Sequence, residues 1–171
     1  MSAPHLQLAL ADAAATEALG ANIAHSIARA FELARVASAS SARPPPLTIF
    51  LQGELGAGKT TLAQGLLRAL GVTGTIRSPS YTLVEPYDTS LGLILHADLY
   101  RLSSARDIEA LDLFDAATAA KVLLVEWPER AQELLPVPDL HVQLLPTATG
   151  RQAVIQIVNS TIRLDNGKNS V

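Results

Sequence analysis

The stretch from Gly53 to Thr60 (GELGAGKT) constrains the fold of this chain more than any other, because it matches the phosphate-binding pattern G-x-x-x-x-G-K-[ST] in full. The preceding residues 47–52 (LTIFLQ) are apolar and partly β-branched, which predicts a buried strand. The following residues 59–70 predict a helix that ends at Gly71. In this context, the backbone N–H groups of the loop and the helix N-terminus converge on a phosphate.

The composition fits one globular domain over residues 1–171, since 171 residues with 49% hydrophobic content can bury one core. Charged residues make up only 17% and the net charge is -3, which argues against holding DNA or RNA on a broad basic surface. The absence of cysteine excludes disulfides and thiolate metal sites. No apolar run is long enough to cross a bilayer and the N-terminus lacks a signal-peptide pattern, so we expect a cytoplasmic protein without membrane contact.

The order of elements predicts an α/β fold of the P-loop NTPase type, with a mostly parallel central sheet flanked by helices. We expect the first regular element to be a helix over 12–37, where apolar residues recur at helical spacing. A proline-bearing linker over 38–46 follows. The nucleotide-binding core is expected over 47–160 and a frayed tail over 165–171.

Further elements are expected within this core. The patterns predict strands at 91–96 and 121–126, a helix at 105–120, and an antiparallel C-terminal hairpin of 140–145 with 153–158. The run over 121–126 is apolar enough to be buried on both faces of a parallel sheet.

The residue types of the loop indicate how it would hold ATP and Mg²⁺. Lys59 places an ammonium at the β- and γ-phosphates, and Thr60 offers a hydroxyl to the metal. Thr61 is either a second hydroxyl near the α-phosphate or an ordinary first-turn threonine. Glu126 ends an apolar strand in the manner of a Walker B acid, which predicts a role in holding the metal.

A second acid, Asp98, follows the other candidate strand. It could orient an attacking water or complete the outer shell of Mg²⁺, and the alternative is a cap for the following turn. We interpret His96 as a neutral histidine facing along its strand rather than as a ligand or base. Arg101 could neutralise charge on the γ-phosphate, or it could be a solvated arginine.

Four segments occur together in this order: GELGAGKTT, SPSYTLVEPY, HADLYRL and LLVEWPE. Together they resemble the bacterial TsaE family, the ATPase component of tRNA threonylcarbamoyladenosine (t6A) biosynthesis, over about residues 12–151. The resemblance implies ATP and Mg²⁺ as cofactors, slow ATP hydrolysis, and action with the proteins TsaB and TsaD. Contact with tRNA would then be indirect, through that complex.

The resemblance also assigns roles to residues. It implies that Thr60 and Glu126 bind magnesium and that Asp98 is needed for hydrolysis. Together with the roles argued from residue types, the expected catalytic residues are Lys59, Asp98 and Glu126, and the expected metal ligands are Thr60, Glu126 and Asp98. The resemblance further implies that Ser78 to Tyr87 is a mobile segment facing the γ-phosphate. With Thr61 added from its residue type, the expected nucleotide-binding residues are Ala13, Leu55, Gly56, Ala57, Gly58, Lys59, Thr60, Thr61, Trp127, Glu129, Gly150 and Arg151.

Three alternative functions start from the same phosphate-binding loop. A small-molecule P-loop kinase would share the loop but usually has an arginine-rich lid, whereas arginine is scattered here. A GTPase would need an Asn-Lys-x-Asp element, which the sequence lacks. A nucleotide-dependent assembly scaffold without significant catalysis stays open.

Overall fold

The computed structural model describes residues 5–37, 46–79, 82–104, 107 and 113–164. Its helices are α1 (Ala13–Ala37), α2 (Lys59–Ala69), α3 (Leu113–Ala119) and a short 3-10 helix, η2 (Pro128–Arg130). Its strands are β1 (His5–Leu10), β2 (Leu47–Gly53), β3 (Val84–Thr89), β4 (Gly92–Asp98), β5 (Val122–Glu126), β6 (Leu140–Thr147) and β7 (Gly150–Ile157).

The strands form one seven-stranded sheet in the order β1-β7-β6-β2-β5-β4-β3. The four central strands, from β6 through β2 and β5 to β4, are parallel, and the three outer pairings are antiparallel. The sheet is therefore mixed, with its parallel part at the centre. Because parallel strands end at the same edge, the carboxyl ends of β2, β4 and β5 meet on one side of the molecule.

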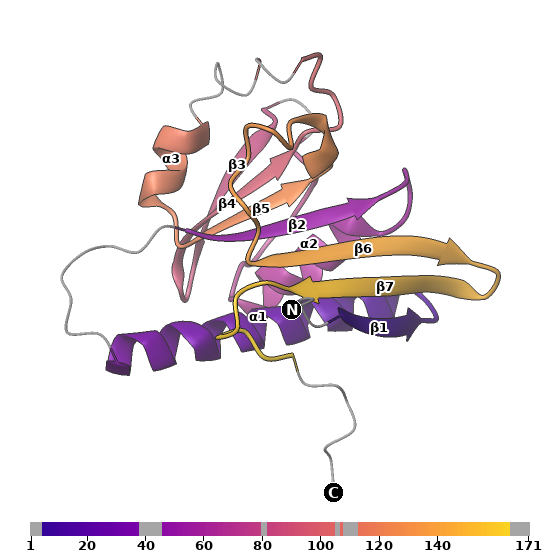
Figure 1. Ribbon diagram of the computed structural model, residues 1–171, viewed down its shortest axis with the longest axis horizontal. Helices are drawn as coiled ribbons and strands as arrows, with labels where there is room; N and C mark the ends of the chain where they lie inside the picture. The colour runs from indigo at the N-terminus through magenta and orange to yellow at the C-terminus, as the bar shows by residue number, and fades with distance from the viewer. Residues whose placement is uncertain (1–4, 38–45, 80–81, 105–106, 108–112, 165–171) are drawn as a thin grey trace, which may run out of the picture.

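Helices cover both faces of the sheet, as Figure 1 shows with α1 and α2 on one side and α3 on the other. The larger cluster of buried apolar residues packs α1 and α2 against the central strands, and it includes Ile23, Leu62 and Leu66. The smaller cluster lies on the other face and includes Phe50, Leu113 and Leu123. The α/β class and the flanking helices are as predicted.

Close approach of α1 to α2 depends on two glycines. A Cβ added to Gly65 would lie 2.0 Å from the carbonyl oxygen of Glu17, and one added to Gly20 would lie 2.1 Å from that of Leu62. The Arg68 guanidinium also pairs with the Glu17 carboxylate across this contact. The helix that follows the phosphate-binding loop is thus held directly against the N-terminal helix.

The prediction that a helix is the first regular element is wrong. Strand β1 precedes α1 and pairs antiparallel with β7, with Leu6 opposite Ile155 and Leu8 opposite Ala153. Leu6 and Leu8 pack against the main core, and the intervening residues are exposed. This alternation has the period of a strand, and the sequence HLQLAL carries it.

The other predicted elements are the C-terminal hairpin, the helix at 105–120, the linker and the tail. The C-terminal hairpin is present and reaches further than predicted, to Thr147 and Gly150. The predicted helix at 105–120 is described only in part, as α3 from Leu113. The predicted linker, apart from Pro46, and the predicted tail lie outside the described residues. Within the described ranges, the helices are too short or too polar to cross a membrane.

Candidate functional site

The loop from Gly53 to Thr60 joins the end of β2 to the start of α2, as the pattern predicts. Its glycines take conformations that a side chain would obstruct. Gly58 has φ +103°, and a Cβ there would lie 2.1 Å from Nη1 of Arg151. Gly53 has φ +151°, and its Cβ would lie 2.6 Å from the carbonyl oxygen of Leu144. The loop is therefore tightly seated against the β6–β7 hairpin.

The Lys59 side chain folds back over its own loop and is only 4% exposed. Its Nζ donates to the carbonyl oxygens of Gly53 at 2.6 Å and Glu54 at 2.8 Å. The same Nζ lies 3.8 Å from the centre of the Trp127 ring, within cation–π range. The ammonium thus has two carbonyls and an aromatic face as partners at the mouth of the loop.

Burial lowers the pKa of Lys59 below its usual value of 10.5, since removal from water disfavours the charged form. Attraction to three carboxylates opposes this effect and raises the pKa. The three carboxylates are those of Glu126, Glu129 and Asp98. The three carboxylates thus offset only part of the effect of burial, and the pKa of Lys59 stays below its usual value.

Glu126 is the last residue of β5 and is 1% exposed. The Thr60 hydroxyl donates to its Oε2 at 3.0 Å, which joins the first turn of α2 to the end of β5. Its other oxygen, Oε1, lies 2.9 Å from Nε2 of His96, a fully buried residue of β4. Thr60 and Glu126, two of the three residues predicted to hold the metal, are therefore in direct contact.

Asp98 is the last residue of β4 and lies opposite Glu126 in the parallel register. Its Oδ1 accepts from the backbone N–H of Tyr100 at 3.0 Å, so the carboxylate does cap the following turn. Its Oδ2 accepts from the Ser78 hydroxyl, which belongs to the segment before β3. Asp98 can thus cap the turn with one oxygen and still lie beside the proposed metal site.

A cavity of about 400 Å³ opens over these residues. It is lined by Leu55, Gly56, Gly58, Lys59, Thr60, Thr61, Ser78, Pro79, Leu83, Asp98, Tyr100, Arg101, Glu126 and Trp127. Nine of the predicted site residues are in this lining, and every side of it comes from a segment that the sequence singled out. The loop, the two acids and three residues of the segment predicted to face the γ-phosphate (Ser78, Pro79 and Leu83) therefore converge on one space. Residues 80–81 of that segment lie outside the described residues.

Five of the predicted nucleotide-binding residues do not line this cavity. Ala57 is buried, and its N–H donates to the Glu54 carbonyl at 3.1 Å within the loop. Glu129 instead lines a neighbouring cavity of about 260 Å³ together with His141. The other three are Ala13, Gly150 and Arg151.

These three residues lie where the β6–β7 turn meets the end of β1 and the start of α1. Arg151 touches the loop at Gly58, and Thr16 of α1 lies 3.5 Å from the position of a Gly58 Cβ. A Cβ on Gly150 would lie 2.4 Å from the carbonyl oxygen of Leu10, so this glycine permits the hairpin to approach β1. Ala13 begins α1, one residue after Asp12, whose carboxylate accepts from the N–H of Ala15.

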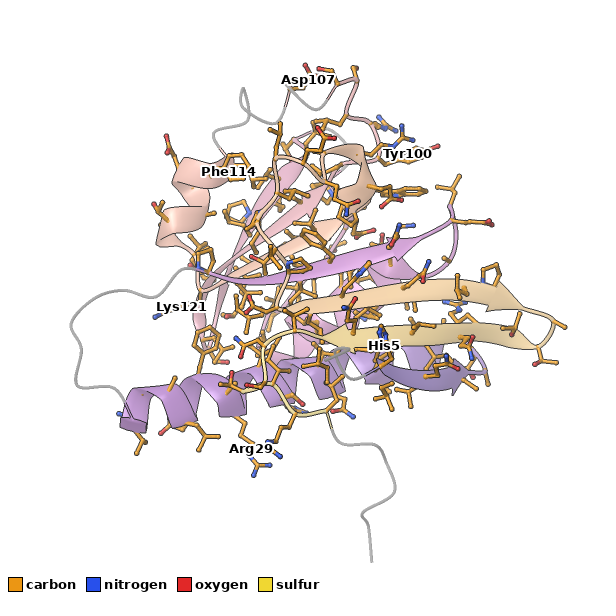
Figure 2. The ribbon with its side chains drawn as sticks, viewed as in Figure 1. His5, Arg29, Tyr100, Asp107, Phe114 and Lys121 are labelled. Atoms are coloured by element: carbon orange, nitrogen blue, oxygen red, sulfur yellow. The ribbon has the colours of Figure 1, made fainter. Side chains whose placement is uncertain are left out.

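The sequence assigns no individual role to Tyr100, Pro79 or Leu83, although all three line the cavity and the last two belong to the segment predicted to face the γ-phosphate. The Tyr100 and Trp127 rings lie 4.9 Å apart, and Figure 2 shows Tyr100 at the end of the sheet opposite Lys121. Trp127 and Leu83 have φ of +57° and +58°, conformations rare for residues other than glycine. The place of Tyr100 just after β4 is a signal that the sequence carries. The left-handed backbone of Trp127 and Leu83 has no counterpart in the sequence.

The donors at this site fit Mg²⁺, which prefers hard oxygen ligands and takes few of them from protein when phosphates and water supply the rest. Thr60 and Glu126 offer a hydroxyl and a carboxylate, and Asp98 a second carboxylate one strand away. Among the described residues no group of three or more His, Asp and Glu side chains could enclose a metal. The hydroxyl and the two carboxylates would suit an ion whose other ligands are phosphate oxygens and water.

Residues 10–153 match the family described as "Threonylcarbamoyl adenosine biosynthesis protein TsaE". The chain is 41% identical over 98 residues to the tRNA threonylcarbamoyladenosine biosynthesis protein TsaE of Haemophilus influenzae, covering 57% of this chain and 62% of that protein. It is 45% identical over 94 residues to the Synechocystis protein of the same name, covering 50% and 57%. The Rickettsia felis protein is 35% identical over 124 residues, covering 72% and 71%.

The fold is also that of a solved structure, "Crystal structure of Bacillus subtilus YdiB". That structure superposes with a TM-score of 0.66 at 24% sequence identity, covering 92% of this chain and 88% of the other. At this identity the likeness concerns the fold.

Proposed function

This chain belongs to the TsaE family, and from that premise we propose that it binds ATP with Mg²⁺ and hydrolyses it slowly as part of tRNA t6A biosynthesis. The matched stretches span 62% and 57% of the Haemophilus and Synechocystis relatives. Activity, substrate and partners therefore all belong to the proposal.

The contact between Thr60 and Glu126 carries the nucleotide part of this proposal. A hydroxyl from the first turn after a phosphate-binding loop and a carboxylate from the end of a neighbouring strand meet at 3.0 Å. Such a pair can share a magnesium ion whose remaining ligands are phosphate oxygens and water. When bound, the ion would neutralise charge that develops on the phosphates.

Lys59 and Asp98 complete the proposed roles. A triphosphate in the loop would compete with the Gly53 and Glu54 carbonyls for the Lys59 ammonium, and a full negative charge is the stronger acceptor. Asp98 has Ser78 and the Tyr100 N–H fixing its carboxylate beside Glu126. We assign it the orientation of the attacking water, because phosphoryl transfer depends on positioning and electrostatics more than on proton removal.

The proposed setting is the cytoplasm, with TsaB and TsaD as partners and tRNA reached only through them. The family's name supports a place in t6A biosynthesis. The low charge content, 17% with a net charge of -3, supports contact with tRNA through other proteins rather than through a basic surface of this chain.

Phosphate release and complex formation test the proposal together. Steady-state release should be measured for the chain alone and with TsaB and TsaD, and t6A in tRNA should be followed in the same samples. Preference for GTP over ATP in a binding titration would contradict the cofactor assignment. A chain whose Lys59→Ala variant hydrolyses ATP and supports t6A formation as well as before would contradict the ATPase assignment.

A small-molecule kinase is the second candidate, because Arg101 lines the cavity and could meet the charge of a phosphoryl acceptor. Transfer of labelled γ-phosphate to a small acceptor would favour it. A nucleotide-dependent scaffold would bind ATP and the partners with no measurable release of phosphate.

A further inference from the structure

The two oxygens of the Glu126 carboxylate have different donors. Oε2 accepts from Thr60, which lines the cavity, and Oε1 lies 2.9 Å from Nε2 of His96. Since a carboxylate can only accept, Nε2 carries the hydrogen in this bond. His96 therefore occupies the oxygen that points away from Thr60.

His96 reaches this oxygen from beneath the site. It is fully buried on β4, opposite Leu124 of β5 on one side and Glu85 of β3 on the other. It is absent from the cavity lining, so it would act on a ligand only through Glu126. The Tyr87 ring lies 6.4 Å away and helps to fix the imidazole by packing.

Packing alone does not explain a histidine at position 96, because among the residues that the structure describes this side chain leaves a polar atom buried and unpaired. In the described part of the chain its Nδ1 is buried without a hydrogen-bond partner. An unpartnered buried polar atom destabilises a fold, and a leucine of similar volume would avoid this. The histidine is therefore better explained by the hydrogen bond that its Nε2–H donates to the Glu126 carboxylate.

We propose that His96 is a positioning residue that fixes the Glu126 carboxylate so that Oε2 and Thr60 are presented together to magnesium-bound nucleotide. The inference rests on the proposed function and adds a part to it. Groups that hydrogen-bond to metal-binding side chains orient them, and their loss typically lowers metal affinity by about 10–100-fold.

The test is a magnesium titration of nucleotide binding. Binding of a non-hydrolysable ATP analogue, adenosine 5′-(β,γ-imido)triphosphate, is measured by calorimetry in EDTA and at increasing Mg²⁺. In His96→Leu we expect affinity in EDTA within about twofold of the unsubstituted chain and a magnesium half-saturation raised about 10-fold or more. Loss of Nε2–H acts on the metal and leaves the phosphate loop in place.

Two amide variants separate positioning from folding. The Gln amide nitrogen can reach the place of the imidazole Nε2, whereas Asn is one methylene shorter. His96→Gln should therefore bring the magnesium concentration for half-saturation back to within about threefold of that of the unsubstituted chain, and His96→Asn should not. This comparison stands even if the leucine variant does not fold.

His141 provides a matched control, because its Nε2 is likewise buried and unpartnered, and it lines a different cavity. His141→Leu should leave the magnesium half-saturation unchanged. A folded His96→Leu with unchanged magnesium dependence, or equal behaviour of the Gln and Asn variants, would overturn the inference. If the unsubstituted chain binds the analogue equally with and without Mg²⁺, the proposed function itself fails and the inference with it.

Discussion

Asp98 and Glu126 are direct neighbours across the parallel strands β4 and β5, each as the last residue of its strand. This register places two carboxylates at the edge where β2 ends in the phosphate-binding loop. One acid is tied to Thr60 and His96, and the other to Ser78 and the Tyr100 N–H. The two adjacent carboxylates thus have different hydrogen-bond partners, which fits the different roles proposed for them: metal binding for Glu126 and orientation of water for Asp98.

Replacing Glu126 by Gln should abolish magnesium-dependent ATP hydrolysis. The amide keeps the shape but loses the charge that a metal needs, so we expect a loss on the order of 100-fold or more in phosphate release. Nucleotide binding in EDTA should change little. The matched variant Glu133→Gln, at an exposed acid, should hydrolyse ATP normally, and equal activity of both variants would contradict the role of Glu126.

The buried ammonium of Lys59 predicts a dependence of stability on pH. Its folded-state pKa is lowered, so the unfolded chain holds more protons between that pKa and 10.5. The free energy of unfolding should therefore rise through this window relative to Lys59→Met, which has no such group. Parallel urea denaturation of the two proteins from neutral to alkaline pH measures the difference, and a gap that stays constant or falls would contradict the prediction.

Trp127 should report nucleotide binding through its fluorescence. It is the single tryptophan of the chain, and the Lys59 ammonium lies 3.8 Å from its ring centre. Because phosphates would draw the ammonium away from the ring, addition of ATP should change the emission. Lys59→Met should remove most of this change. Arg29→Met should keep it, because Arg29 lies on the opposite side of the molecule from Tyr100, whose ring contacts Trp127 (Figure 2). An identical response in Lys59→Met would show that the ammonium is not responsible.

Gly65→Ala should destabilise the fold. Its methyl group would lie 2.0 Å from the Glu17 carbonyl oxygen, which forces α1 and α2 apart. Overpacking of this kind costs about 1–3 kcal/mol, measurable by chemical denaturation. Leu33→Ala, at a side chain 59% exposed on α1, should change stability by less than about 0.5 kcal/mol. A Gly65→Ala protein of unchanged stability would mean that the helices can separate at no cost.

The sequence predicts the central part of this fold because local signals and long-range pairing agree there. The glycine pattern fixes the turn from β2 to α2, and the uninterrupted apolar run of β5 requires burial on both faces. The acids Glu126 and Asp98 could be placed at one edge because parallel strands share their carboxyl ends. Their roles in hydrolysis and metal binding stay predictions.

Other features depend on contacts that one sequence does not display. Pairing of β1 with β7 joins residues at opposite ends of the described chain, so the short alternation in HLQLAL had no visible partner. The bond from His96 to Glu126 needs the lateral register of β4 and β5 at atomic detail. The cation–π contact of Lys59 depends on the left-handed conformation of Trp127, which residue type alone does not indicate.

The seating of Arg151 against Gly58, with β7 paired to β1, has a consequence for how the protein is made. On the ribosome, the phosphate-binding loop and α1 emerge long before the hairpin that completes their surroundings. Strand β1 must wait, unpaired, until β7 has been synthesised. Nucleotide capture should therefore become possible only late in translation, which ties the appearance of binding to near-completion of the sheet.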